Sequence, residues 1–233
     1  MQILTQADAP VAAEPIEPRL RRAGLAAALL LAPWAIVATN AGWAIAQNDG
    51  ATDETGADQL AAAAAHPTLL HATVLLGMIG ALLMIPAALA VARVAAQGAA
   101  RLSFVGGTLT AAGYACYLAV LAPDLRTIAA ARLGNQVGGY AAVVDTAQQD
   151  TSTVWVFLLF VAGNLIGTFL IGLALWRSRA VARWIAVAVM AWPFLHIAGL
   201  ALTAEVFEVA GAAVQGVAFA AVATRLLRRV AAR

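Results

Sequence analysis

The feature that most constrains this chain is an uncharged run of twenty-three residues, 154–176, followed by three arginines within the next seven residues. As a helix, such a run is about 34 Å long at ~1.5 Å per residue, and a hydrocarbon core is roughly 30 Å thick. Arg177, Arg179 and Arg183 would be costly to carry through lipid, and arginine-rich loops stay on the cytoplasmic side. The run therefore predicts a transmembrane helix that ends in the cytoplasm.

The composition of the whole chain agrees with a membrane protein. Hydrophobic residues make up 63 % and charged residues 11 %, against about 45–50 % and about 25 % in soluble domains. The basic residues are all arginines, so a Lys Schiff base, and with it a retinal protein, is excluded. The single cysteine, Cys116, excludes a disulfide framework and a Cys-based metal cluster. The net charge of +2 gives no reason to expect a nucleic-acid partner.

Hydropathy along the chain predicts an all-α bundle of six transmembrane helices with both termini cytoplasmic. The expected domain spans residues 23–229 after a flexible cytoplasmic tail, residues 1–22. Pro67 suits the first turn of the second helix, and Pro86 should kink that helix. The helices are expected at about residues 23–46, 67–92, 102–122, 154–176, 180–203 and 206–227.

The loops between these helices differ in length and charge. Residues 47–59 contain acids and no basic residue, so they form an exterior loop, and residues 93–101 form a short cytoplasmic turn. The long segment 123–152 should lie on the outer interface, with short surface helices at 129–132 and 137–144.

The distribution of arginine supports this threading. Of fourteen arginines, only Arg126 and Arg132 fall outside, which leaves twelve on the cytoplasmic side. Arginine in place of lysine, together with abundant alanine, is typical of GC-rich bacterial genomes, which favours the bacterial inner membrane. A cleaved signal peptide remains the alternative for the first helix, because Ala44-Ile45-Ala46 is an A-x-A site.

Polar side chains at membrane depth are candidates for function. The candidate pocket or ligand-binding residues are His71, Asn164, His196, Glu205 and Glu208. The structural alternative is that each histidine donates to a neighbouring helix and only orients the bundle. His71 and His196 also sit at similar depths, so they are a possible axial pair for haem b, and a metal site that includes Glu205 or Glu208 is a further alternative. No resident cofactor or metal is expected.

Two further patterns concern packing. Gly163 and Gly167 form a G-x-x-x-G pattern, which allows close helix approach. Packing inside the bundle is its expected use, with homodimerisation as the alternative. The six tryptophans lie mostly near helix ends and are interpreted as interfacial anchors.

The segments AAAAAHPTLL at residues 61–70 and GLALWRSR at residues 172–179 carry a resemblance. With the acidic loop before the first and Ala182-Arg183-Trp184 after the second, the chain resembles a bacterial group of six-helix membrane proteins classed only as a domain of unknown function. The resemblance covers roughly residues 20–203. It implies the fold and the inner membrane, and it carries no catalytic residue.

Two functions are compatible with these observations. No P-loop, zincin helix, nucleophile elbow or C-x-x-C occurs, so the first is a binding, sensing or accessory subunit in the lipid bilayer, alone, as a homodimer or with a partner membrane subunit. The second is a small secondary carrier with an outward-facing pocket between helices two, four and five. Pro86, Pro193 and Asn164 would supply the irregular backbone that carrier sites use.

Overall fold

The computed structural model describes residues 16–52, 54–134 and 139–231, and all its regular elements are helices. Their bounds are α1 (Ile16–Asn48), α2 (Gly56–Ala65), α3 (Pro67–Leu133), α4 (Tyr140–Gln149), α5 (Thr151–Ala162), the π-helical turn η2 (Gly163–Gly167), α6 (Thr168–Ser178), α7 (Arg183–Leu202) and α8 (Val206–Ala231). The prediction of an all-α protein is confirmed.

Several of these helices are long and apolar enough to cross a membrane. Five such stretches occur among the described residues, namely Leu20–Asn48, Pro67–Leu133, Thr151–Ser178, Arg183–Leu202 and Val206–Leu227. The second of them, Pro67–Leu133, has 67 residues and would be about 100 Å long if straight, more than three times the thickness of a hydrocarbon core.

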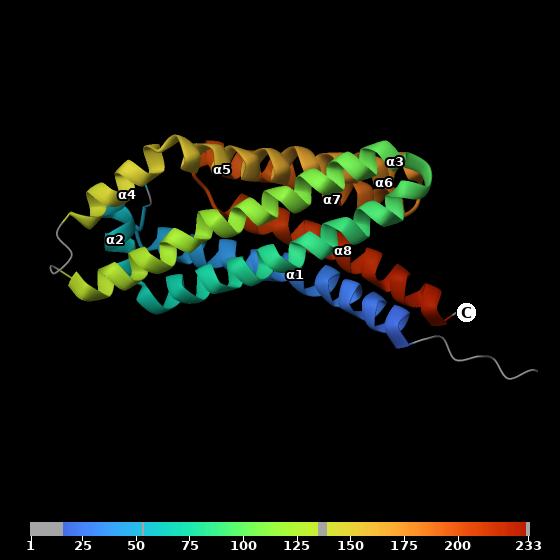
Figure 1. Ribbon diagram of the computed structural model, residues 1–233, viewed down its shortest axis with the longest axis horizontal. Helices are drawn as coiled ribbons and strands as arrows, with labels where there is room; N and C mark the ends of the chain where they lie inside the picture. Colours follow the sequence, from blue (N-terminus) through green and yellow to red (C-terminus); the bar gives the residue numbers. More distant parts are fainter. Residues whose placement is uncertain (1–15, 53, 135–138, 232–233) are drawn as a thin grey trace, which may run out of the picture.

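Helix α3 is not straight. Ala99 has non-helical dihedral angles, φ −150° and ψ 51°, and the chain folds back there, so that residues 67–98 and 100–133 form two legs (Figure 1). The reversal lies within the predicted turn 93–101. Dihedral angles remain helical at Pro86, so the expected kink at that proline is not where α3 breaks.

The helices run lengthwise along an elongated bundle (Figure 1). The bend of α3, the start of α1 and the end of α8 lie at one end, the Ala99 end, whereas α2 and α4 lie at the other, the α2/α4 end. Helix α1 packs against α3 and α8, α7 packs between α6 and α8, and the α5–η2–α6 rod follows α3.

The interior is filled by close-packed apolar side chains. Leu29, Met84, Ile171, Trp192 and Phe219 are each at most 2 % exposed and belong to one cluster, together with many alanines. Alanine and glycine let the helix axes approach closely, which is how helices associate where no water drives them together.

The Gly163/Gly167 pattern packs inside the bundle, as predicted. A Cβ added at Gly163 would lie 2.4 Å from the carbonyl oxygen of Leu109, and one at Gly167 would lie 2.6 Å from the backbone nitrogen of Thr110. Gly113 of α3 faces Gly163 in the same way. Backbone therefore meets backbone at this contact.

Several predicted boundaries are wrong. Residues 1–15 of the expected tail lie outside the described residues, but residues 16–22 are helical and belong to α1. The third predicted helix does not end at residue 122, because α3 continues through Pro123 to Leu133. Residues 129–132 are therefore the end of α3 and not a separate surface helix.

The continuation of α3 beyond Pro123 has a physical reason. Leu121 and Ile128 are buried against Ala62 and Ala63 of α2, and this burial offsets the backbone hydrogen bond that a proline inside a helix removes. The other expected surface helix, residues 137–144, is displaced, because α4 begins at Tyr140 after Gly139 in the left-handed region (φ 84°).

Helix α2 has no counterpart among the six predicted helices. A capping box starts it: the Thr55 side chain accepts from the Asp58 amide, and the Asp58 side chain accepts from the Thr55 amide. Asp145 of α4 accepts from the Gly56 amide at 2.7 Å. Helices α2 and α4 are thus joined to each other at their end of the bundle.

Candidate functional site

The candidate site is built around an acid–imidazole pair where α7 and α8 meet. His196 Nδ1 lies 3.0 Å from Glu208 Oε2, and these side chains are 13 % and 10 % exposed. The ring is not aligned for a hydrogen bond at that nitrogen, so the contact is an ion pair when the imidazole is protonated. Gly199 makes room for it, because a Cβ there would lie 2.8 Å from Glu208 Cγ.

The imidazole is continuous with a second polar contact deeper in the bundle. His196 lies one helical turn from Trp192, and their ring centroids are 5.2 Å apart. The Trp192 indole donates to Asn164 Oδ1 at 3.1 Å. Both Trp192 and Asn164 are at most 3 % exposed, so this hydrogen bond satisfies two polar groups that have no access to water.

Asn164 lies in the π-helical turn η2. A π-helical turn inside a transmembrane helix often marks a functional position, because it widens the helix locally. Here the widened turn includes both glycines that contact α3. The turn therefore gives Asn164 its place beside Trp192.

Toward the α2/α4 end, the polar contacts continue. Gln47 of α1 donates from Nε2 to Glu205 Oε1 at 3.5 Å. The Tyr117 phenol on the second leg of α3 lies within electrostatic reach of Asp124, Glu208 and Glu205. Its ring is stacked on Phe160 of α5, with centroids 4.5 Å apart.

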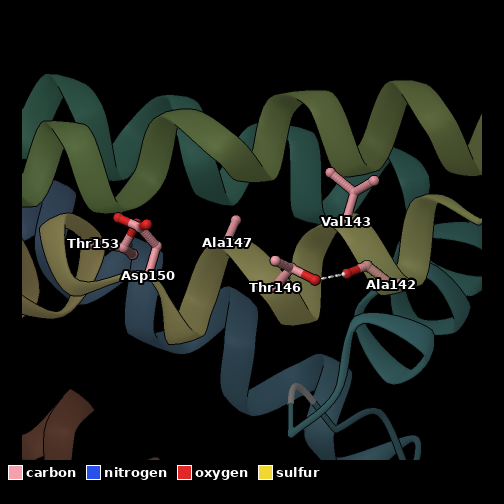
Figure 2. Close-up of a pocket in the computed structure, with 6 residues that line it drawn as sticks. All are labelled: Ala142, Val143, Thr146, Ala147, Asp150 and Thr153. Carbon is pink, nitrogen blue, oxygen red and sulfur yellow. Dashed lines mark hydrogen bonds between the residues drawn. The ribbon is translucent and has the colours of Figure 1, made fainter.

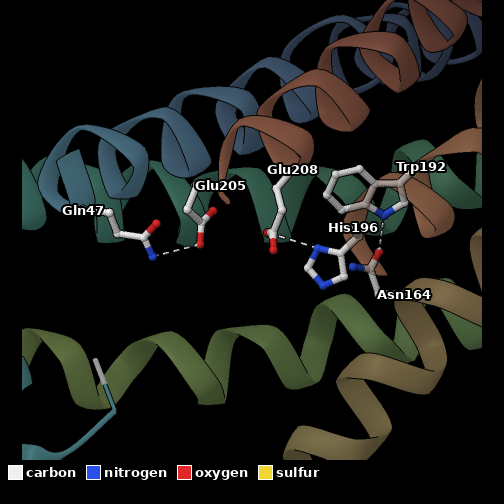
Figure 3. Close-up of polar contacts among 6 residues, drawn as sticks. All are labelled: Gln47, Asn164, Trp192, His196, Glu205 and Glu208. Atoms are coloured by element: carbon white, nitrogen blue, oxygen red, sulfur yellow. Dashed lines mark hydrogen bonds and ion pairs between the residues drawn. The ribbon is translucent and has the colours of Figure 1, made fainter. Parts of the chain in front are cut away.

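Figure 3 shows how these side chains are arranged. Gln47, Glu205, Glu208 and His196 follow one another along the bundle, and Asn164 and Trp192 come next. The two carboxylates and the imidazole point to the same side, toward α3. We call these six residues and Tyr117 the polar row.

The structure brings together four of the five predicted site residues: Asn164, His196, Glu205 and Glu208. His71 does not share their described contacts. It lies near the start of α3, whose first leg packs on α1 and α2, whereas His196 lies on α7, which packs on α6 and α8.

The histidines and carboxylates give little support to a metal or haem. Among the described residues, no group of three or more His, Cys, Asp and Glu side chains is placed to hold a metal ion. Glu208 occupies the Nδ1 side of His196, and His71 is on a leg with different neighbours. Haem ligation by this pair stays a prediction.

A separate recess lies at the junction of α4 and α5 (Figure 2). Its volume is about 540 Å³, and it is lined by Ala142, Val143, Thr146, Ala147, Asp150 and Thr153. The one ionisable side chain there, Asp150, already caps α5. This recess contains none of the residues predicted to line an outward-facing pocket.

Sequence reasoning missed three members of the polar row: Gln47, Trp192 and Tyr117. Trp34, Trp155, Trp176 and Trp184 are exposed as expected of anchors, but Trp192 is 2 % exposed and is no anchor. Its position four residues before His196 was the available signal, because residues at that spacing share one helix face.

No protein-family model matches this chain, and no curated protein or solved structure is detectably similar to it.

Proposed function

We propose that this chain is a six-crossing protein of the bacterial inner membrane that senses exterior protons as an accessory subunit. Counting the two legs of α3 separately turns the five membrane-length stretches into six crossings. Both termini are then on one side. Arg93 and Arg101 flank the turn at Ala99, and Arg177 and Arg179 flank Ser178, which contacts Gly98 beside that turn. By the positive-inside rule we infer that this end is cytoplasmic.

The observation that carries the proposal is the His196–Glu208 pair, at the exterior end of a close-packed core. Imidazole is the side chain that changes charge near neutral pH. Glu205, directly before α8, lies beside Glu208 (Figure 3), and both carboxylates interact electrostatically with the Tyr117 phenol of α3. Protonation of His196 therefore adds a positive charge among carboxylates.

A change of charge at His196 has a direct route into the bundle. The Trp192 ring is next to the imidazole, and a protonated imidazole is attracted by an indole face where a neutral one is not. Trp192 in turn holds Asn164 in the π-helical turn. We infer that this contact passes the signal from α7 to the α5–η2–α6 rod.

The carrier alternative has one observation in its favour. Asn164 is buried in a π-helical turn in the middle of a transmembrane helix, and irregular backbone at mid-membrane is typical of carrier sites. The close-packed alanine-rich core favours a sensing subunit over a carrier.

The test uses Trp192 as its own reporter. With the other five tryptophans replaced by phenylalanine, the protein is placed in sealed vesicles of one orientation, and only the outer pH is changed. Trp192 fluorescence should fall as the outside is acidified, because a protonated imidazole quenches a nearby indole.

A matched variant tests which group binds the proton. His196→Gln should abolish the response, because an amide side chain does not change charge near neutral pH. A response that persists in His196→Gln, or one that follows only the inner pH, would contradict the proposal.

A further inference from the structure

The turn inside α3 and the turn between α6 and α7 meet at the Ala99 end of the bundle. Gly98 lies beside Ser178, and a Cβ added at Gly98 would fall 2.8 Å from Ser178 Cα. Since a side chain there would push the two backbones apart, the glycine allows turns that are distant in the sequence to form one surface. We call the place where Gly98 and Ser178 meet the turn contact.

Positive charge gathers around the turn contact. Arg101 follows Gly98 by three positions, and Arg177 and Arg179 flank Ser178. All three arginines are exposed. The packing of α3 on α6 therefore brings together charges that the sequence distributes over two separate turns.

These arginines have no acidic counterpart in the elements that carry them. Residues 67–123 and 151–204 include both turns and the helices on either side, and they contain no Asp or Glu. None of the three arginines makes an ion pair or a hydrogen bond with another described side chain. A cluster of positive charges without counterions in the protein attracts anions from its surroundings.

Exposed apolar side chains continue from the arginines along the bundle. Phe104 is 74 % exposed and lies one turn from Arg101 on the same face of α3. Trp176 precedes Arg177 and is 38 % exposed, and the guanidinium carbon of Arg183 lies 5.2 Å from the centroid of its ring. Tryptophan beside arginine is typical of the headgroup level of a membrane. A soluble anion would contact only the charged part of this surface, whereas a phospholipid matches both parts.

We propose that the turn contact binds the headgroup of an anionic phospholipid. Its phosphates bind Arg101, Arg177 and Arg179, and its acyl chains lie beside Phe104 and Trp176. Guanidinium groups bind phosphate oxygens through paired hydrogen bonds, and basic surfaces between transmembrane helices on the cytoplasmic side bind such headgroups in other membrane proteins. Three arginines exceed the single charge of one phosphate, so a lipid with two phosphates, cardiolipin, fits best.

Lipid titration of the purified full chain tests the site. The protein in neutral detergent is titrated with cardiolipin, phosphatidylglycerol or phosphatidylcholine, and bound lipid is counted by native mass spectrometry. Cardiolipin should bind about 10-fold more tightly than phosphatidylglycerol, and phosphatidylcholine should bind most weakly, because the negative charge of the headgroup decreases in that order.

Substitutions locate the binding surface. Arg177→Gln combined with Arg179→Gln should weaken cardiolipin binding about 10-fold or more. Arg126→Gln combined with Arg132→Gln is the matched control, because it removes two exposed arginines from the α2/α4 end of α3. Arg225→Gln removes an exposed arginine at the Ala99 end from α8, which packs on α1 and α7. Neither control should change the affinity by more than about 2-fold, because neither removes a contact with the lipid.

A charge-conserving variant guards against effects on folding or orientation. Arg177→Lys combined with Arg179→Lys keeps both charges but loses the paired hydrogen bonds, so its affinity should lie between those of the unchanged protein and the glutamine variant.

Three outcomes would overturn the inference. The first is equal affinity for the three lipids, and the second is equal weakening by the turn-contact pair and by the Arg126/Arg132 pair. The third is displacement of bound cardiolipin by an equimolar amount of inorganic pyrophosphate, which would identify a soluble anion as the ligand. The inference goes beyond proton sensing and needs only that the chain spans a membrane, so failure of lipid binding leaves the fluorescence response of Trp192 to be judged by itself.

Discussion

A polar side chain inside this bundle costs free energy unless a second polar group meets it, since lipid offers no hydrogen bond. Trp192 and Asn164 satisfy each other through a hydrogen bond from the indole to the amide oxygen. His196 and Glu208 do so only partly, because their contact changes strength with protonation. A side chain whose contact with its partner is strong in one charge state and weak in the other is suited to a pH switch.

At the residue scale, Asp150 gives a prediction outside the membrane. The Ser152 hydroxyl and amide both donate to its carboxylate, and these hydrogen bonds hold the pKa of Asp150 below its usual value. A lowered folded-state pKa means that the cap stabilises α5 above the ordinary pKa and is lost as pH falls through the lowered one. Protection of the Ser152 amide from hydrogen exchange should decrease over that acid range.

The control for this prediction is Asp150→Asn, which keeps an oxygen acceptor but does not titrate. Its protection at Ser152 should be independent of pH in the acid range after correction for intrinsic exchange. Asp150→Ala should lower protection at neutral pH as well. If acid reduces protection equally in Asp150→Asn, the carboxylate is not the titrating group.

At the element scale, the helices are held by backbone contacts that only small residues permit. The α5–η2–α6 rod meets the second leg of α3 through Gly163, Gly167, Gly106 and Gly113. Close approach at these positions places Asn164 beside Trp192 of the next helix. The same contact that stabilises the rod therefore positions the polar row.

Gly163→Ala should destabilise the protein by about 1–3 kcal/mol, the usual cost of overpacking. The added Cβ would fall 2.4 Å from the Leu109 carbonyl oxygen, and neither backbone can move aside without separating the helices. The measurement is the unfolding midpoint in detergent titrated with denaturant.

Gly24→Ala is the matched control, because a Cβ at that helical glycine meets nothing within 4 Å. There alanine should be neutral or stabilising by up to about 1 kcal/mol, since it fits a helix better than glycine. Equal midpoints for the two variants would show that the Gly163 contact is not tight.

At the scale of the whole molecule, the two ends of the bundle differ in charge. Arg93 and Arg101 flank the turn at Ala99, and Arg177 and Arg179 flank Ser178, which contacts Gly98 beside that turn. The helices α2 and α4 at the other end contain Asp58 and Asp145 and no arginine. From this asymmetry the positive-inside rule predicts that the Ala99 end is cytoplasmic. With that orientation, we expect the candidate site to face the exterior.

Reporter fusions test this orientation. Fusions after Gly50, Gln148 and Glu208 should report the exterior, and fusions after Gln97 and Arg179 the cytoplasm, because arginine-rich loops are retained inside. An exterior signal at Arg179 would invert the orientation. A mature protein that begins at Gln47 would instead make the first helix a signal peptide.

Hydropathy was enough to predict the membrane class and the approximate positions of the long helices, because each helix must be apolar along its own length to lie in lipid. Arg93 and Arg101 likewise marked the segment in which α3 turns back. The helix boundaries could not all be predicted from the local sequence. Nothing in the sequence near Pro123 shows that α2 would bury the next turns of α3.

The candidate site was likewise only partly predictable from the sequence. Asn164, His196, Glu205 and Glu208 are visible in the sequence as isolated polar residues in apolar surroundings. Their partners are not, because Trp192 on α7 reaches Asn164, and Gln47 on α1 reaches Glu205, only after helices distant in sequence have packed together. The sequence determines which residues lie in the membrane, since that depends on each segment alone, and tertiary packing decides which of them meet.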